Sequence, residues 1–286
     1  MHNVKMTSVQ KEELMTNQPL SGKTVVVTGS SSGIGRAIAE RLGAAGAHVY
    51  LSGRTLEAME ASKAKIEAAG GKATPVIVNM RDVKQVQGLV EEAERATGHV
   101  DIMVNNAGVS YPGAIADADP EGWREMLETN ILALLAGTQS AIRSMRKNKV
   151  EGHIVNISSV AAQRNDSGVY GSTKHAVNCI SGTLRAELEN DTIRVVTIMP
   201  GAIATNFARN FEPAVVQGIV KMAGIDVEVK KGERLPDELF DSLPAALRNT
   251  LGAPDDIANA VLYAVTQPIT INVAEIVVRP PRQLAF

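Results

Sequence analysis

The sequence predicts an α/β fold, in which one doubly wound parallel sheet of about seven strands carries helices on both faces. Two observations lead to this class. Short, apolar, β-branched stretches alternate with helical periodicities six times in succession, an order typical of right-handed strand–helix–strand units. No break in composition interrupts the alternation, so we expect residues 21–286 to form a single domain.

The predicted strands are short apolar runs bounded by turn residues. The first of them is β-branched throughout and apolar after its first residue, as suits a strand buried on both faces of a sheet. The strands are expected at residues 24–27, 47–52, 73–78, 100–104, 152–157, 193–199 and 272–278.

The predicted helices fill the segments between these strands. A helix from Ile34 follows the first strand directly, and Gly70 and Gly71 end the next one. Pro120 suits the first turn of a long helix. The remaining helices are expected at residues 56–69, 83–96, 120–147, 169–189 and 254–266.

Composition excludes several functions. The net charge of −2 over 286 residues gives no basic footprint for nucleic acid, and no apolar run approaches the length of a membrane span. Cys179 is the only cysteine and the five histidines are scattered, so we expect no metal site. Residues 1–20 are polar and lack the apolar core of a signal peptide, which predicts a flexible arm, or else a subunit contact, on a cytoplasmic protein.

A glycine-rich turn follows the first strand. Gly29, Gly33 and Gly35 fall within seven residues, immediately before a helical pattern. Glycines let a ligand approach the main chain closely, and a helix N-terminus attracts phosphate. The turn therefore indicates a dinucleotide site, although its spacing departs from the general Gly-x-Gly-x2-Gly pattern and glycines also make ordinary tight turns.

Several short motifs follow this turn in a fixed order. They are Asn105-Asn106-Ala107-Gly108, Asn130, Ile157-Ser158-Ser159, Tyr170-x3-Lys174 and Pro200-Gly201. Together with Thr28-Gly29-x3-Gly33-Ile34-Gly35, this set resembles the single-domain branch of the short-chain dehydrogenase/reductase family, over residues 22 to about 280. The resemblance implies a Rossmann-like, dinucleotide-binding catalytic domain.

Tyr170 and Lys174 lie four residues apart on a predicted helix, so both project from one face. A phenol titrates near pH 10, and a nearby ammonium should lower that pKa enough for proton exchange with an alcohol or carbonyl oxygen. Without the other motifs, the favoured interpretation would be that Tyr170 is a capped, partly buried residue at the helix start and Lys174 a solvated neighbour.

The resemblance assigns a role to each catalytic residue. Ser159 would bind the substrate oxygen, Tyr170 would act as general acid/base, and Lys174 would hold the nicotinamide ribose. Asn130 would help to maintain a proton relay through water, unless it is simply a buried amide bonded to backbone. The segment from Ser159 to Tyr170 is shorter than is usual in the family, which leaves Ser158 open as the catalytic serine, although Ser159 is favoured.

The cofactor is expected to be NADP(H). An acid at the end of the second strand would select NAD, but Gly53 stands there and Arg54 follows, a guanidinium able to bind a 2′-phosphate. Arg54 could instead be a surface residue that opens a helix. The residues expected to bind the cofactor are Gly29, Ser31, Ser32, Gly33, Ile34, Gly35, Arg54, Asn79, Asn106, Ala107, Gly108, Tyr170, Lys174, Pro200, Gly201, Ile203 and Thr205.

The alternation of elements fails between residues 206 and 252, so this long loop is expected to select the substrate, with help from residues 109–113 and 161–168. Its apolar positions suggest a partly hydrophobic carbonyl or alcohol substrate, although they could simply pack the loop against the rest of the domain. Arg164 and Arg209 are candidates for an anionic group but could be solvated surface residues. The leading function is an NADP(H)-dependent alcohol dehydrogenase or carbonyl reductase. A sugar-nucleotide epimerase or dehydratase, or an NADPH sensor without turnover, are the alternatives. The family resemblance also implies a homo-oligomer, a tetramer or a dimer.

Overall fold

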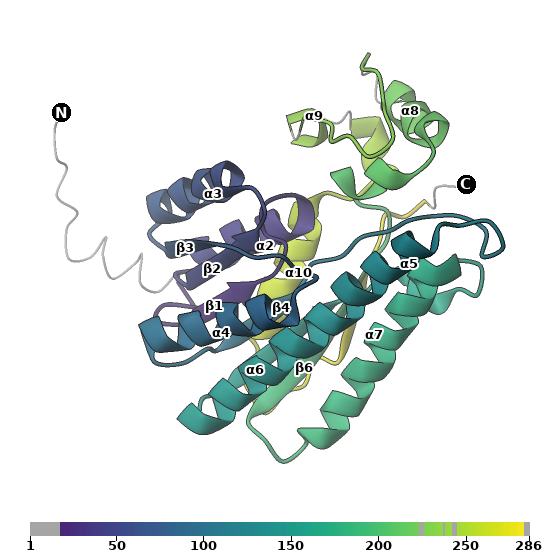
Figure 1. Cartoon of the computed structure of the whole chain (residues 1–286). Coiled ribbons are helices and arrows are strands. Elements are labelled where there is room, and N and C mark those ends of the chain that lie inside the picture. Colours follow the sequence, from purple (N-terminus) through teal and green to yellow (C-terminus); the bar gives the residue numbers. More distant parts are fainter. Residues whose placement is uncertain (1–17, 223–225, 237, 242–244, 283–286) are drawn as a thin grey trace, which may run out of the picture.

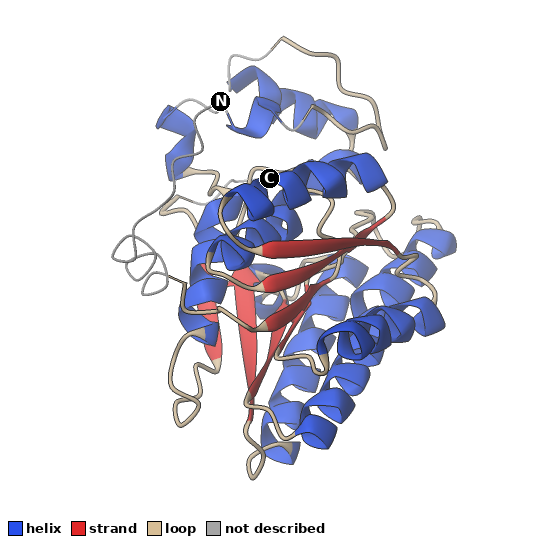
Figure 2. Cartoon of the chain, turned by 90° about the vertical axis from the view of Figure 1, so that its left-hand side faces the viewer, coloured by secondary structure: helices blue, strands red, loops and turns tan. Residues whose placement is uncertain are grey.

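The computed structural model describes residues 18–222, 226–236, 238–241 and 245–282. Its centre is one parallel seven-stranded sheet of order β3-β2-β1-β4-β5-β6-β7 (Figures 1 and 2). The strands are β1 (Thr24–Val27), β2 (His48–Gly53), β3 (Lys72–Ile77), β4 (Ile102–Asn105), β5 (Gly152–Ile157), β6 (Ile193–Pro200) and β7 (Glu275–Val278). The predicted Rossmann-like fold is confirmed.

Helices cover both faces of the sheet (Figure 2). On one face lie α2 (Gly33–Ala44), α3 (Leu56–Ala68) and α10 (Pro254–Val265). On the other lie α4 (Val83–Thr97), α5 (Pro120–Leu127), α6 (Ala133–Asn148) and α7 (Gly168–Glu187). The side chains of β1 alternate between these two layers: Val25 and Val27 pack with α2 and α10, whereas Val26 packs with α4 and α6.

The order of the strands fixes where a ligand can bind. The chain leaves β1 toward β2 and β3 on one side, and returns to β4 on the other. Connections therefore diverge at the carboxyl ends of β1 and β4, and a crevice opens at such a switch point in doubly wound sheets. The glycine-rich turn lies at the end of β1, so the fold sets it at this crevice.

One long helix expected at residues 120–147 is interrupted. A π-helical turn, η1 (Glu128–Leu132), separates α5 from α6 and contains Asn130. The sequence gives no warning, because neither glycine nor proline breaks the helical pattern there. Buried hydrogen bonds from the Asn130 side chain, described below, accompany this wide turn, and π turns are frequent at functional sites.

The described residues of the segment 206–252 form short helices that lie above the carboxyl edge of the sheet (Figure 1). We call this segment the lid. It includes η3 (Asn206–Asn210), α8 (Pro213–Met222), α9 (Glu238–Asp241) and η4 (Ala245–Asn249). At the opposite end of the chain, most of the expected N-terminal arm lies outside the described residues, but Leu20 is buried against the core.

Candidate active site

A cavity of about 300 Å³ opens at the carboxyl ends of β1, β4 and β5. We call it the first cavity. Every residue that the sequence predicts to bind the cofactor lines it, and so do Ser158 and Ser159. Other residues that line the cavity were not expected from the sequence to bind the cofactor. They include Met80, which follows β3, Glu125 in α5, and Arg209 and Arg234 in the lid.

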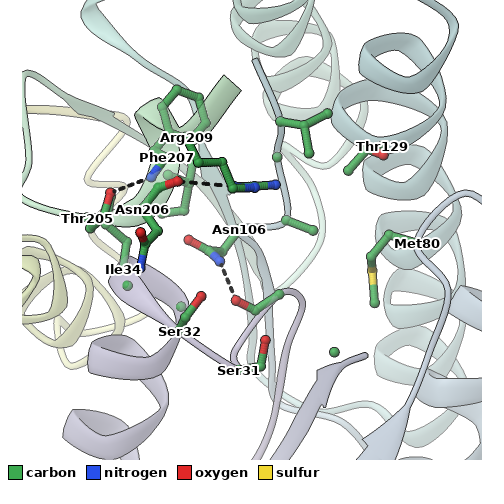
Figure 3. A pocket seen from close by; sticks show the side chains of 18 of the residues that line it. Ser31, Ser32, Ile34, Met80, Asn106, Thr129, Thr205, Asn206, Phe207 and Arg209 are labelled. Carbon is green, nitrogen blue, oxygen red and sulfur yellow. Dashed lines mark hydrogen bonds between the residues drawn. The ribbon is translucent and has the colours of Figure 1, made fainter. Parts of the chain in front are cut away.

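The glycine-rich turn forms the floor of this cavity. Because its glycines carry no side chains, a ligand can lie directly against the main chain there. Gly29 and Gly33 have φ angles of +66° and +55°, which other residues rarely adopt. A Cβ on Gly35 would overlap the Gly29 carbonyl oxygen and the Asn106 amide. The Ser32 side chain makes no capping bond to α2, so hydroxyl and helix N-terminus both face the cavity (Figure 3). This cradle fits a dinucleotide phosphate.

Asn106 holds the ends of β1 and β4 together. Its Nδ2 donates to the carbonyl oxygens of Thr28 and Gly29 at 2.9 and 3.2 Å. The Thr28 hydroxyl accepts from the backbone N–H groups of Asn106 and Ala107 at 3.0 and 3.1 Å. The motif after β4 therefore fixes the wall of the cavity beside the glycine-rich turn.

Tyr170 and Lys174 both reach the first cavity from α7. Lys174 is buried, and its Nζ donates to the carbonyl of Ile157 at 2.8 Å and lies 5.9 Å from the centroid of the Tyr170 ring. The pair therefore shares one face of α7, as its spacing predicts.

The pKa of Tyr170 differs from the expectation. Burial raises it to about 12, although the Ser159 hydroxyl acts in the opposite direction. Burial also lowers the pKa of Lys174 to about 8. The prediction that the Lys174 ammonium would bring the Tyr170 pKa below its usual value is wrong for this structure, because desolvation of the phenolate dominates and the opposing effect comes from the Ser159 hydroxyl.

The two candidate serines differ in surroundings. Ser158 is buried, and its hydroxyl donates to the backbone carbonyl of Lys174 at 3.3 Å. Ser159 is more open: its Oγ accepts from the Ala161 N–H at 3.1 Å, and its side chain lines both the first cavity and a second one. The geometry therefore favours Ser159 for contact with a substrate.

Asn130 does not line the first cavity. Its Oδ1 accepts from the N–H of Val109 at 2.9 Å, and its Nδ2 donates to the Val109 carbonyl and to the Thr173 hydroxyl, each at 3.0 Å. Both ends of the amide are therefore bonded to protein. The side chain joins the segment after β4 to α7, one residue before Lys174.

A second cavity of about 640 Å³ adjoins the first beneath the lid. The two share the lining residues Ser159, Gly201, Ile203, Thr205, Asn206, Phe207 and Arg209. The Phe207 ring lies 5.4 Å from that of Tyr170, centroid to centroid. Apolar side chains dominate the rest of the wall: Val160, Ala161, Phe211, Val216, Ile219, Val220, Val229, Leu235, Phe240 and Leu251.

Residues 18–222, 226–236, 238–241 and 245–282 lack two features. Within those ranges no group of three His, Cys, Asp or Glu side chains could hold a metal ion. Within the same ranges, no helix is long and apolar enough to cross a membrane.

Comparison with known proteins agrees with this geometry. The sequence profile of the family described as short chain dehydrogenase matches residues 23–215, more than half of the chain. The protein therefore belongs to the short-chain dehydrogenase/reductase family, a class of oxidoreductases.

Two relatives and one solved structure illustrate the similarity. Glycine betaine reductase ATRR of Emericella nidulans is 35% identical over 265 residues, which are 92% of this chain but 19% of that relative, so the chain spans about a fifth of it. Farnesol dehydrogenase of Aedes aegypti is 33% identical, covering 91% of this chain and 96% of the relative. A metagenomic short-chain oxidoreductase solved with NADP superimposes with a TM-score of 0.71 at 29% identity, covering 92% of this chain and 98% of that one.

Proposed function

We propose that this protein is an NADP(H)-dependent alcohol dehydrogenase or carbonyl reductase, built as a single catalytic domain. The observation that carries this proposal is that Ser159 and Tyr170 both line the cavity bordered by the glycine-rich turn, and that Ser159 also lines the apolar cavity beside it. When bound, the nicotinamide would supply or accept the hydride at the substrate carbon.

The cofactor proposal rests on the residues around the end of β2. Gly53 ends this strand, where an acid would bind the ribose of NAD, and the exposed Arg54 follows at the cavity wall. A Cβ on Gly53 would lie 2.9 Å from Ser31, so the strand end closely approaches the glycine-rich turn. Arg54 and Ser31 would together bind a 2′-phosphate. The metagenomic relative solved with NADP supports the same choice.

Each catalytic residue has a part in this proposal. Ser159 would donate a hydrogen bond to the substrate carbonyl oxygen, and Tyr170 would give that oxygen its proton. Lys174 would hold the nicotinamide ribose, and Asn130 would keep Lys174 and the segment after β4 in place. A Tyr170 pKa of about 12 leaves the hydroxyl protonated at neutral pH, which suits the direction of carbonyl reduction.

The substrate proposal follows from the second cavity. A wall built mainly from aliphatic and phenylalanine side chains favours a large apolar carbonyl compound or the corresponding alcohol. The relative named farnesol dehydrogenase supports this choice, because farnesol is an apolar alcohol.

The experiment that tests the proposal is NADPH consumption against a panel of aldehydes and ketones of increasing apolar size, with Tyr170→Phe as control. Turnover that rises with apolar size and disappears in the variant is the expected result. Tight NADPH binding without turnover on any member would instead favour a sensor.

We also propose a homo-oligomer, a tetramer or a dimer. Leu127, Leu132 and Leu135 project apolar side chains from α5, η1 and α6, each at least 40% exposed. Such a stripe is typical of a surface that packs against a second subunit. Light scattering should give a mass above that of the 30.3 kDa monomer; a monomer would refute the proposal.

A further inference from the structure

Three arginines from separate parts of the chain face the first cavity. Arg54 follows β2, Arg209 belongs to η3 and Arg234 to the lid segment 226–236. Figure 3 shows Arg209 extending from η3 across the cavity, above Asn106 and on the side opposite Ser31 and Ser32. Burial lowers the pKa of Arg209, and the positive charges of Arg234 and Arg54 lower it further, so these guanidinium groups lie within electrostatic reach of one another.

Hydrogen bonds within the lid fix two of these arginines side by side. The Asn206 amide donates to the carbonyl of Leu235 and accepts from its N–H, both at 2.8 Å. The Arg209 carbonyl accepts from Gly232 N–H at 2.7 Å, and its guanidinium donates to the Asn206 carbonyl at 3.2 Å. Segment 226–236 is thereby tied to η3, which brings Arg234 beside Arg209.

The lid also reaches across the cavity. The Asn210 amide donates to the backbone carbonyl of Ser110 at 3.2 Å, on the segment that follows β4. Arg209, on the same short helix, is half-buried between the two cavities and lines both. The lid therefore forms a roof over the first cavity, with the glycine-rich turn as its floor.

Few negative charges in the first cavity balance the positive charges of these arginines. Among the described residues that line it, Glu125 is the one acid, and its carboxylate accepts from the Tyr111 hydroxyl at 2.9 Å. Arg81 also lines the cavity but is paired with Glu121 and Glu128. Even without Arg234, the described lining holds Arg54, Arg209 and Lys174 against Glu125, an excess of positive charge that a bound anion would stabilise.

The cavity that Arg234 lines indicates whether the bound anion belongs to the cofactor or to the substrate. Its neighbours Glu233 and Leu235 line the second cavity, whereas Arg234 lines only the first. Within residues 233–235, Arg234 is thus directed toward the first cavity, whereas Glu233 and Leu235 are directed toward the second. A purely substrate-binding role would place the charge on the other side.

We propose that Arg209 and Arg234 bind phosphate groups of the dinucleotide from the lid, opposite the glycine-rich turn, and that the bound cofactor thereby holds the lid over the second cavity. This inference rests on the proposed use of a nicotinamide dinucleotide. It does not depend on catalysis, because it concerns binding alone.

Calorimetric titration with NADPH and with NADH tests the inference. We expect Arg209→Gln and Arg234→Gln each to raise the Kd of NADPH at least tenfold, as loss of a charge-assisted hydrogen bond does. Arg209→Lys should recover part of the affinity. The matched control is Arg248→Gln, which removes a lid arginine that lines neither cavity and should leave the Kd unchanged.

The two cofactors distinguish the phosphates. An equal loss for NADPH and NADH assigns the arginines to the diphosphate, whereas a loss for NADPH alone assigns them to the 2′-phosphate. Unchanged Kd values for both cofactors in folded Arg209→Gln and Arg234→Gln proteins would overturn the inference. If only the KM of an anionic carbonyl compound rose, the arginines would bind substrate, which would overturn it as well.

A second experiment measures how readily a protease cleaves the lid. Endoproteinase Lys-C cleaves after lysine, and Lys221 and Lys230 are exposed lid sites that the arginine variants leave intact. NADPH should slow cleavage there in the wild-type protein and in Arg248→Gln, but not in the Arg209→Gln, Arg234→Gln double variant. Equal protection in all proteins would contradict the coupling of cofactor to lid. Arginine-dependent NADPH binding without turnover on any carbonyl would leave this inference standing while refuting the proposed reductase.

Discussion

The side chain of Asn130 exchanges two hydrogen bonds with the backbone of Val109, accepting at 2.9 Å and donating at 3.0 Å. Asn130 is 1% exposed and lies in the π turn between α5 and α6. A third bond reaches Thr173, the residue before Lys174. One amide thus connects the wall after β4 to the helix that carries the catalytic pair.

Replacing Asn130 should therefore weaken the fold as well as the site. Asn130→Ala leaves the buried N–H and carbonyl of Val109 unsatisfied, and should lower the free energy of unfolding by about 3 kcal/mol. Urea denaturation measures this loss. Asn148→Ala, at the partly exposed end of α6, is the control and should cost less than about 1 kcal/mol. Equal losses in the two variants would contradict the special position of Asn130.

Any side chain at Gly35 should weaken cofactor binding. In Gly35→Ala the new methyl group would overlap the Gly29 carbonyl oxygen and the Asn106 amide, so the turn must shift and NADPH affinity should fall more than tenfold. Gly88→Ala is the matched control, since a Cβ there meets nothing within 4 Å in the middle of α4. That substitution should preserve binding and stabilise the protein by about 0.5–1 kcal/mol. Calorimetry and thermal unfolding measure both effects.

Carbonyl reduction should decline in alkaline solution. The buried Lys174 has a pKa of about 8, so its ammonium is present below that pH and is lost above it, whereas the Tyr170 proton is retained up to a pKa of about 12. We expect kcat/KM to be level near neutrality and to fall by about tenfold per pH unit above pH 8. A profile that stays level to pH 10 would exclude a required Lys174 ammonium.

Acid should destabilise the protein through His153. Burial lowers the pKa of this histidine from 6.5 to about 4, helped by the charges of Lys23 and Arg194. The unfolded chain binds a proton between these two pH values and the folded chain does not, so stability falls as pH drops from 6.5 toward 4, by about 3 kcal/mol in total. Urea midpoints across this range should show less acid dependence in His153→Leu. An unchanged dependence in that variant would assign the effect to other groups.

Filling the second cavity should affect large substrates selectively. Ile219 lines this cavity, and Ile219→Trp should raise the KM for a bulky apolar ketone about tenfold, with little change for a small one. Val215→Trp adds the same side chain at an exposed position of α8 outside the cavity, and should change neither KM. Parallel effects of the two variants would mean that the cavity does not receive the substrate.

Local patterns allowed most of the fold and of the first cavity to be predicted. The seven strands follow from short apolar runs such as Thr24–Val27, because burial on both faces leaves a continuous apolar pattern. The glycine-rich turn and the motif after β4 could also be predicted, because their residues lie at short, characteristic spacings in the sequence. The observed ends of helices and strands differ from the predicted ends by one to three residues. The largest difference is at β7, where pairing with β6 begins only at Glu275.

The remaining features depend on contacts between distant segments. The π turn at Asn130 goes with bonds to Val109 and Thr173, which are 21 and 43 residues away. The direction of Arg234 follows from the pairing of Asn206 with Leu235, a contact that no sequence motif marks. The raised pKa of Tyr170 reflects burial, which only the assembled site produces.

The most direct test of the central claim is hydride transfer from NADPH labelled with deuterium at C4 of the nicotinamide. The wild-type protein, given the best carbonyl compound of the panel, should form an alcohol that carries deuterium on its carbinol carbon, and Tyr170→Phe should form almost none. Mass spectrometry of the product would contradict the account if the wild-type protein bound NADPH but yielded no labelled alcohol from any carbonyl compound, or if Tyr170→Phe yielded it equally well.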